Sequence, residues 1–168
     1  KMYVAWFTEH IALKEGIARI EETKLTQLLL DLYDSVKEEK IAVLGVNPHA
    51  GDNGVLGDEE GSIIQAIENA NTFLHKEVFH GPLVPDIAFT PHVRRNFKHF
   101  VAMYHDQGLI PIKMHAFQQT VNVTMGLPFL RTSVGHGTAE GLVGRGTARA
   151  DNLIAAIDTA ITLVQQAV

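Results

Sequence analysis

The amino-acid sequence predicts an α/β fold built on a largely parallel sheet. Short β-branched or apolar runs alternate with stretches of helical periodicity, and loops containing glycine or proline separate them. The run at 41–46, Ile-Ala-Val-Leu-Gly-Val, is apolar throughout, which is typical of a parallel strand buried on both faces. A length of 168 residues also suits one domain, so we expect a single α/β lobe over 1–168.

The expected elements follow one another along the chain. The strands are expected at 3–7, 41–46, 100–104, 121–125 and 129–133. Helices should begin at Thr23, Asp58 and Asp151, residues that commonly cap helices. Their inward residues are expected to be Leu25, Leu28, Leu29, Leu32 and Val36 in the first helix, Ile63, Ile64, Ile67 and Leu74 in the second, and Leu153, Ile154, Ile157, Ile161 and Val164 in the third. Glycine and proline predict loops at 47–57 and 81–85.

The composition excludes several classes of protein. With 14 basic and 19 acidic side chains the net charge is −5, and no basic stripe could neutralise the phosphates of a nucleic acid. No apolar run approaches the roughly 20 residues of a membrane span, so we expect neither nucleic acid nor membrane as a partner. The absence of cysteine excludes disulfides, Fe–S clusters and thiolate zinc sites, and it fits the cytoplasm.

Three of the nine histidines follow expected strands. His10 lies three residues after 3–7, His49 three after 41–46, and His105 directly after 100–104. Ligands of open α/β sheets bind at the carboxyl ends of the strands, and parallel strands bring these ends to one edge. Three imidazoles there predict a site for Zn, Co, Ni or Fe, and less naturally for Mg. The alternative is that each is an ordinary solvated loop histidine.

The other histidines carry weaker signals. We expect surface positions for His75, His80, His92, His99 and His115. His136 stays undecided, because it lies in a turn between a strand and a helix where a functional group can be presented. Two carboxylates, Asp86 and Asp106, could ligate a metal, orient an imidazole or accept a substrate proton, or they could simply form turns.

Cations and glycines point to an anionic substrate. Lys113 and Arg131 lie in apolar runs and need an anionic partner, and Asn122 is a polar residue within an expected strand. The glycine-rich loop at 45–54 could approach a phosphate through its backbone N–H groups. It matches neither the Walker A pattern nor the Gly-x-Gly-x-x-Gly dinucleotide fingerprint, so the residues that bind a cofactor remain unknown.

Four motifs in order resemble the 4-hydroxythreonine-4-phosphate dehydrogenase family of pyridoxal 5′-phosphate biosynthesis. They are Asn-Pro-His-Ala-Gly at 47–51, Gly-Pro-Leu with an aspartate at 81–86, Ala-Met-Tyr-His-Asp-Gln-Gly at 102–108, and Val-Asn-Val-Thr-Met-Gly-Leu-Pro-Phe-Leu-Arg-Thr-Ser at 121–133. The resemblance runs from about Thr8 to the end and covers the C-terminal half of the family's usual chain.

The resemblance implies a fold and a reaction. The fold is the two-lobe fold of the isocitrate and isopropylmalate dehydrogenases, of which this chain would be the C-terminal half, in a homodimer whose active site draws residues from both subunits. The reaction is the oxidation of 4-phosphonooxy-threonine with NAD (or NADP) and a divalent metal (Zn, Co, Ni or Mg). The resulting β-keto acid loses CO2 and gives 3-amino-2-oxopropyl phosphate.

The resemblance also implies roles for individual residues. His10, His49 and His105 would be the metal ligands. Lys113, Asn122 and Arg131 would contact the substrate. Asp86 and Asp106 would be carboxylates near the metal, either of which could accept the hydroxyl proton.

One departure from the family keeps alternatives open. The family has an aspartate where this chain has Gly135. Threonate or erythronate 4-phosphate is therefore an alternative substrate. A non-catalytic metal- or phosphate-binding fragment is a second alternative, since a chain without the N-terminal lobe could bind metal without turning over substrate. A histidine-zinc hydrolase is disfavoured because no His-Glu-x-x-His motif is present.

Overall fold

The computed structural model describes residues 1–166 and divides the chain into two compact units. The first is Lys1–Pro111 and the second is Ile112–Val168. Two such units can belong to one lobe, so the single-lobe organisation stays a prediction.

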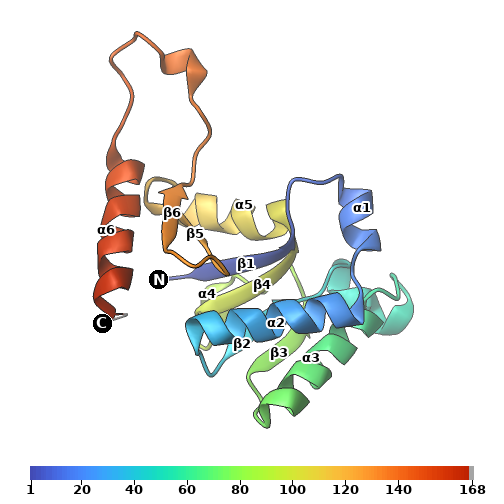
Figure 1. Ribbon diagram of the computed structural model, residues 1–168. Coiled ribbons are helices and arrows are strands. Elements are labelled where there is room, and N and C mark those ends of the chain that lie inside the picture. Colours follow the sequence, from blue (N-terminus) through green and yellow to red (C-terminus); the bar gives the residue numbers. More distant parts are fainter. Residues whose placement is uncertain (167–168) are drawn as a thin grey trace. The chain divides into compact units, whose positions relative to one another are not determined.

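The first unit contains a four-stranded parallel sheet (Figure 1). Its strands are β1 (Tyr3–Thr8), β2 (Ile41–Leu44), β3 (Phe79–Leu83) and β4 (His99–Tyr104), in the order β1-β4-β2-β3. The expected α/β class and the largely parallel sheet are confirmed. Every residue of β2 is fully buried, as its continuously apolar sequence predicts.

Side chains that alternate along the strands build a core on each face of the sheet. Ile41 and Val43 point to one face, where helices α2 (Glu22–Val36) and α3 (Glu60–Leu74) lie side by side and cover it (Figure 1). Ala42 and Leu44 point to the other face, where the segment containing the short helix α4 (Pro91–Arg94) packs. The six-residue helix α1 (Leu13–Ala18) contacts β4.

Two helices begin at other residues than the sequence predicts. The N-cap of α2 is Glu21, so Thr23 lies inside the helix, and the N-cap of α3 is Glu59 rather than Asp58. The apolar stripes are largely as expected, because Leu25, Leu29, Leu32, Ile63 and Ile67 are buried. Ile64 is 44% exposed, since the stripe of α3 that faces the sheet passes through Ile63, Ala66, Ile67 and Ala70 instead.

Two elements that contain glycine and proline, β3 and α5, were not predicted from the sequence. The expected loop at 81–85 overlaps β3, an edge strand, and an edge strand tolerates proline because its outer side has no ladder to complete. Helix α5 (His105–Ala116) contains Gly108 and Pro111 and places His115 on a helix rather than in a loop. Gly108 permits a close approach to the sheet, because a Cβ there would lie 2.7 Å from Cγ1 of Val4.

The second unit pairs an antiparallel hairpin with one helix. Strands β5 (Val121–Thr124) and β6 (Arg131–Val134) form the hairpin, and α6 (Asp151–Gln166) packs on it. Buried Asn152 joins the two, because its Nδ2 donates to the carbonyls of Gln118 and Thr120, and its Oδ1 accepts from the Gly135 N–H.

The expected inward side of α6 is wrong. The five aliphatic residues that were expected to face inward are each 51–55% exposed, namely Leu153, Ile154, Ile157, Ile161 and Val164. The stripe that is buried or half-buried consists of smaller residues at helical spacing, Asn152, Ala155, Ala156, Thr159 and Ala160, followed by Leu163. A two-stranded hairpin is too narrow to cover both sides of the helix.

Among residues 1–166 no helix is both long and apolar enough to cross a membrane.

His99 is buried rather than on the surface, because it is the first residue of the central strand β4. Its ring stacks on Tyr3 with centroids 4.5 Å apart. Within residues 1–166 its Nδ1 has no hydrogen-bond partner, and Oε1 of Glu38 lies 3.9 Å away. Burial lowers the pKa of His99 below its ordinary value near 6.5, with an opposing contribution from Glu38. His80 on β3 is half-buried beside Phe97, so its expected surface position is also wrong.

The lowered pKa of His99 predicts a loss of stability in acid. Below about pH 6.5 the unfolded chain takes up a proton that folded His99 resists, so the free energy of unfolding falls as the pH drops toward the folded pKa. We expect urea unfolding of His99→Phe, which keeps an aromatic ring against Tyr3, to show a weaker decline between pH 7 and pH 5 than the parent. His92→Phe, at an exposed position on α4, is the control. Equal slopes for His99→Phe and the parent would contradict the assignment.

The close surroundings of Gly135, in the second unit, predict that a larger residue at this position lowers the free energy of unfolding. A Cβ at this position would lie 2.7 Å from the carbonyl oxygen of Thr120, whereas Gly137 has nothing within 4 Å. Gly135→Ala should therefore lower the free energy of unfolding by roughly 1–3 kcal/mol through overpacking. Gly137→Ala should change it little. Equal denaturation midpoints for the two variants would show that Thr120 does not restrict this position.

Candidate functional site

Three adjacent strands bring the predicted metal ligands to one edge of the sheet. β1, β4 and β2 lie side by side and run parallel, so their carboxyl ends share that edge. His10 follows β1 by two residues, His105 begins α5 directly after β4, and His49 lies in the turn Pro48–Gly54 after β2. Thr8 pairs with Tyr104 in the register, which keeps the ends of β1 and β4 level.

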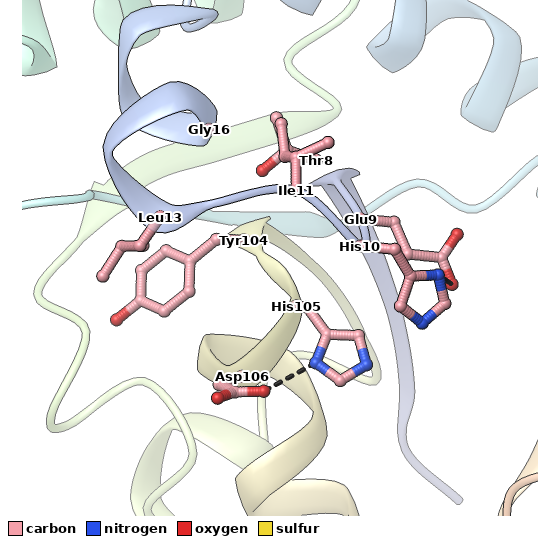
Figure 2. Close-up of a pocket in the computed structure, with 9 residues that line it drawn as sticks. All are labelled: Thr8, Glu9, His10, Ile11, Leu13, Gly16, Tyr104, His105 and Asp106. Carbon is pink, nitrogen blue, oxygen red and sulfur yellow. Dashed lines mark hydrogen bonds and ion pairs between the residues drawn. The ribbon is translucent and has the colours of Figure 1, made fainter. Parts of the chain in front are cut away.

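The His105 imidazole is held in one orientation. Its Nδ1 lies 2.6 Å from Oδ1 of Asp106 (Figure 2). Its ring also meets the Trp6 ring edge-on, with centroids 6.3 Å apart. A carboxylate can only accept, so the proton of the neutral imidazole must sit on Nδ1. Nε2 then keeps its lone pair, as a metal ligand or a proton acceptor requires.

His10 lies beside His105 and completes a pair. The two ring centroids are 5.2 Å apart, and Nδ1 of His10 is 3.5 Å from Oε1 of Glu9. The His10 side chain is 77% exposed. Both histidines line a pocket of about 260 Å³ (Figure 2). Its lining residues are Thr8, Glu9, His10, Ile11, Leu13, Gly16, Tyr104, His105 and Asp106.

The centroid separation of this pair is compatible with two ligands of one metal ion, whereas His49, although it follows a strand at the same edge of the sheet, is not grouped with the pair. Two imidazoles that share a tetrahedral ion at Zn–N distances of about 2.0–2.1 Å have ring centroids roughly 5 Å apart. In residues 1–166 no group of three or more histidine, aspartate or glutamate side chains is arranged to hold an ion. His49 is exposed and lies in a turn whose backbone is left-handed from His49 to Asn53, with φ between 44° and 79°.

The two predicted catalytic carboxylates occupy different surroundings. Asp106 lines the pocket and contacts His105, and its side chain is 70% exposed. Asp86 is exposed in the turn that follows β3 and is not among the residues that line the pocket. The geometry therefore associates Asp106, but not Asp86, with the histidine pair.

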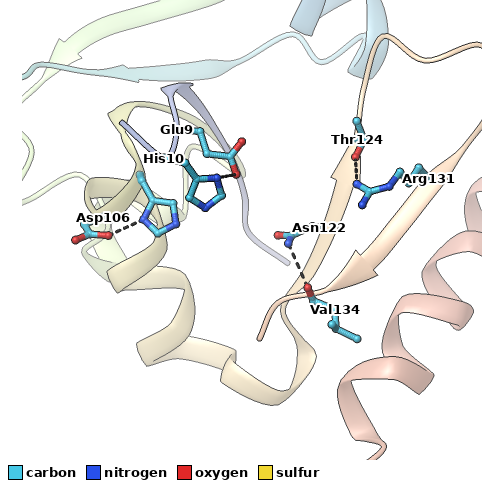
Figure 3. Close-up of polar contacts among 8 residues, drawn as sticks. Glu9, His10, Asp106, Asn122, Thr124, Arg131 and Val134 are labelled. Carbon is cyan, nitrogen blue, oxygen red and sulfur yellow. Dashed lines mark hydrogen bonds and ion pairs between the residues drawn. The ribbon is translucent and has the colours of Figure 1, made fainter. Parts of the chain in front are cut away.

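The predicted substrate residues lie in the second unit. Asn122 and Arg131 share one face of the hairpin, because Asn122 and Thr124 alternate onto the same side of β5 and Arg131 pairs with Thr124. Nη1 of Arg131 donates to Oγ1 of Thr124 at 2.8 Å, and Nδ2 of Asn122 donates to the carbonyl of Val134 at 3.2 Å (Figure 3).

The polar face of the hairpin is opposite to the face that packs on α6. Oγ1 of Thr132, which lies on the α6 side, donates to the carbonyl of Ala156 at 3.0 Å. Lys113 lies half-buried on α5. His136, which the sequence left undecided, is exposed, with Nδ1 2.7 Å from the carbonyl oxygen of Gly137.

Several polar residues at or near the strand ends were not predicted as part of the site. Thr8, Gln107 and Glu60 make hydrogen bonds to the backbone next to the histidine segments. Gln107 lies in the recognised motif at 102–108, which was the available signal, while Glu60 is the last of three consecutive acidic residues and looks like a solvated helix start. The neighbouring Glu59 accepts from Nδ2 of Asn47 at 2.7 Å, and this hydrogen bond lowers the pKa of Glu59.

Comparisons with known proteins identify relatives over almost the whole chain. The sequence model of the family "Pyridoxal phosphate biosynthetic protein PdxA" matches residues 1–160. The 4-hydroxythreonine-4-phosphate dehydrogenase of Sulfurimonas denitrificans is 55% identical over 97% of this chain and 53% of its own length. That of Campylobacter fetus is 48% identical over 97% of this chain and 53% of its own length.

Solved structures agree with these relatives. A 4-hydroxythreonine-4-phosphate dehydrogenase from Klebsiella pneumoniae matches with a TM-score of 0.83 and 35% identity over 96% of this chain and 51% of that one. A terephthalate 1,2-cis-dihydrodiol dehydrogenase from Burkholderia xenovorans matches with a TM-score of 0.65 and 26% identity over 95% of this chain and 52% of that one. This chain spans about half the length of the relatives that it matches, and it belongs to the PdxA family of pyridoxal phosphate biosynthetic proteins.

Proposed function

We propose that the protein takes part in the NAD- or NADP-dependent oxidation and decarboxylation of 4-phosphonooxy-threonine to 3-amino-2-oxopropyl phosphate. The observation that carries the proposal is the His10–His105 pair, oriented by Asp106, at the carboxyl edge of the sheet in a chain of the PdxA family. The relatives that bear the name of this dehydrogenase support it.

His10 and His105 would hold a divalent metal, Zn, Co, Ni or Mg, with His49 as the third ligand. When bound, such an ion lowers the pKa of the substrate hydroxyl and withdraws electrons from its oxygen. The carboxylate of Asp106 keeps the proton of His105 on Nδ1, which presents Nε2 to the pocket.

The oxidation requires the removal of a hydride and a proton from the secondary alcohol; a bound nicotinamide would accept the hydride, and a carboxylate of this chain would take the proton. Asp106 is the stronger candidate for the proton acceptor, because it lines the pocket and most of its side chain is exposed. Asp86 is the other candidate that the sequence suggests. The resulting β-keto acid then loses its carboxyl group as CO2.

Lys113, Asn122 and Arg131 would bind the substrate's phosphate or carboxylate. The hairpin presents Asn122 and Arg131 on one polar face, and a guanidinium can contact an oxyanion through two parallel N–H groups. Fixing both ends of a small substrate also fixes the carbon that loses the hydride.

The family resemblance further suggests a two-lobe fold of the isocitrate dehydrogenase type, in a cytoplasmic homodimer with a shared active site. The coverage of about half of each relative is consistent with one of two lobes. The exposed aliphatic side of α6 offers apolar surface for another lobe or subunit to bury.

Gly135 favours a second candidate, the oxidation of threonate or erythronate 4-phosphate. The family's aspartate is replaced here, and the backbone of Thr120 leaves no room for a Cβ at this position. Loss of an acidic side chain suits a substrate that lacks the amino group of 4-phosphonooxy-threonine. The remaining alternative is a lobe that binds metal or phosphate without catalysis.

A substrate panel distinguishes these functions. Formation of NADH and NADPH would be followed at 340 nm with 4-phosphonooxy-threonine, threonate 4-phosphate and erythronate 4-phosphate, using the gene product that contains this chain. We expect the highest kcat/KM with 4-phosphonooxy-threonine and loss of activity with a chelator. His105→Ala should lower kcat/KM at least about 100-fold because it removes a proposed ligand. His92→Ala, on α4, should not.

The other possible outcomes of the substrate panel support one of the two alternatives. Turnover of only the threonate or erythronate phosphate would select the second candidate. No reduced nucleotide with any substrate, in a folded protein that binds Co²⁺, would support the non-catalytic alternative and contradict the proposal.

The contact between Asp106 and His105 gives a separate prediction. Asp106→Ala should remove the fixed tautomer of His105, because Nδ1 loses its acceptor, and it should weaken metal binding roughly 10–100-fold. Long-range ¹H–¹⁵N spectra of the imidazoles report the tautomer, and Asp34→Ala on the exposed side of α2 is the control. An unchanged His105 spectrum in Asp106→Ala would show that the carboxylate does not orient the ring.

A further inference from the structure

Three strand ends are joined by side chains that are not themselves expected to be ligands. The first connection is between β1 and β4. Thr8 is 7% exposed, and its Oγ1 donates to the carbonyl oxygen of Met103 at 2.9 Å. A side-chain hydrogen bond at this point adds to the backbone ladder and fixes where the chain leaves β1.

Gln107 makes the second connection, between β4 and β2. Its Oε1 accepts from the N–H of Met103 at 2.7 Å, and its Nε2 donates to the carbonyl oxygen of Gly45 at 2.8 Å. The backbone N–H needs an acceptor and the carbonyl needs a donor, and the amide of Gln107 supplies both at once, which a carboxylate or an ammonium group could not. Met103 and Gly45 are buried, and breaking these contacts would leave unpaired polar groups away from water.

Glu60 makes the third connection, between α3 and the segment that follows β2. It is 5% exposed, and its Oε1 accepts from the N–H of Val46 at 2.9 Å and of Asn47 at 2.7 Å. Its Oε2 accepts from Nδ2 of Asn47 at 2.8 Å. Gly51 leaves room for this carboxylate, because a Cβ there would lie 2.8 Å from Oε2.

Two positions before each histidine lies a residue that takes part in these hydrogen bonds, Thr8 through its side chain and Met103 and Asn47 through their backbone. Thr8 precedes His10 by two residues, Met103 precedes His105 by two, and Asn47 precedes His49 by two. We infer that Thr8, Gln107 and Glu60 form a positioning network, here called the strand-end tie, that fixes the backbone from which the three histidines depart. The inference rests on the proposed function, because it assigns a role at the same site.

The tie accounts for a site whose ligands come from three distant segments. Backbone hydrogen bonds between neighbouring strands end with the strands, and the tie supplies side-chain hydrogen bonds just where they stop. Removing a residue that orients a metal ligand without touching the metal commonly lowers the metal affinity.

The test uses the gene product that contains this chain and Co²⁺ as the probe metal. Calorimetry gives the Co²⁺ affinity, and the intensity of the visible absorption band at saturation reports the coordination geometry. We expect Thr8→Val, Gln107→Leu and Glu60→Gln each to weaken Co²⁺ binding roughly 10–100-fold and to change the band. Gln65→Leu, an exposed glutamine on α3, should leave both unchanged and serves as the matched control.

A role in stability alone would lower the urea midpoint and leave the saturated band as in the parent. If Gln107→Leu does not fold, Thr8→Val and Gln107→Glu decide, because both nearly preserve volume while each removes one donor to a backbone carbonyl.

His105→Ala separates failure of the tie from failure of the proposed function. If His105→Ala loses Co²⁺ while folded tie variants bind it with the parent's affinity and band, the tie is wrong and the proposed site stands. If His105→Ala binds Co²⁺ as the parent does, the metal site of the proposed function is wrong and the tie has no ligands to position.

Discussion

The parallel pairing of β1, β4 and β2 is the constraint on which the candidate site depends. Each strand contributes only one histidine segment, and the segments are far apart in sequence, so no local motif could assemble them. Parallel pairing sends all three carboxyl ends to one edge, and the core on both faces of the sheet holds the strands there. The chemistry of the edge then follows from what each strand end carries: two adjacent imidazoles, a carboxylate that orients one of them, and a pocket beside them.

Two glycines at this edge of the sheet, Gly108 and Gly51, allow neighbouring groups to come closer than a side chain at either position would permit. Gly108 brings α5 against the sheet, which directs the chain after His105 back over the face that Val4 and Ala102 occupy. Gly51 brings the turn after β2 against Glu60, a buried carboxylate that satisfies the backbone N–H groups there. At Gly108 the space that a Cβ would fill is taken by the apolar side chains of Val4 and Ala102, and at Gly51 it is taken by the carboxylate of Glu60.

The sequence predicted the elements whose signals are local. β2 is apolar throughout and α2 has leucines at helical spacing, so the sequence pattern predicts both elements. His10, His49 and His105 follow predicted strands, so their place at the strand ends could be predicted as well. β3 and α5 could not be predicted in this way. Gly81 and Pro82 are tolerated because β3 is an edge strand, and Gly108 is accommodated in α5 because the helix packs closely on Val4. A single sequence reveals neither arrangement. The prediction of which side of α6 is buried was wrong, because burial depends on what packs against a helix. The hairpin contacts the small residues of α6 rather than the aliphatic ones. Glu60 and Gln107 matter through backbone partners that only the folded chain brings near.

We propose that His10 and His105 share one divalent ion, with His49 as its third protein ligand. X-ray anomalous scattering at the zinc absorption edge tests it most directly, on crystals of the gene product that contains this chain grown with Zn²⁺. The account predicts one strong peak about 2.0–2.1 Å from a ring nitrogen of each of the three histidines. A fully occupied zinc at other residues, with His10 and His105 outside its coordination sphere, would contradict the account.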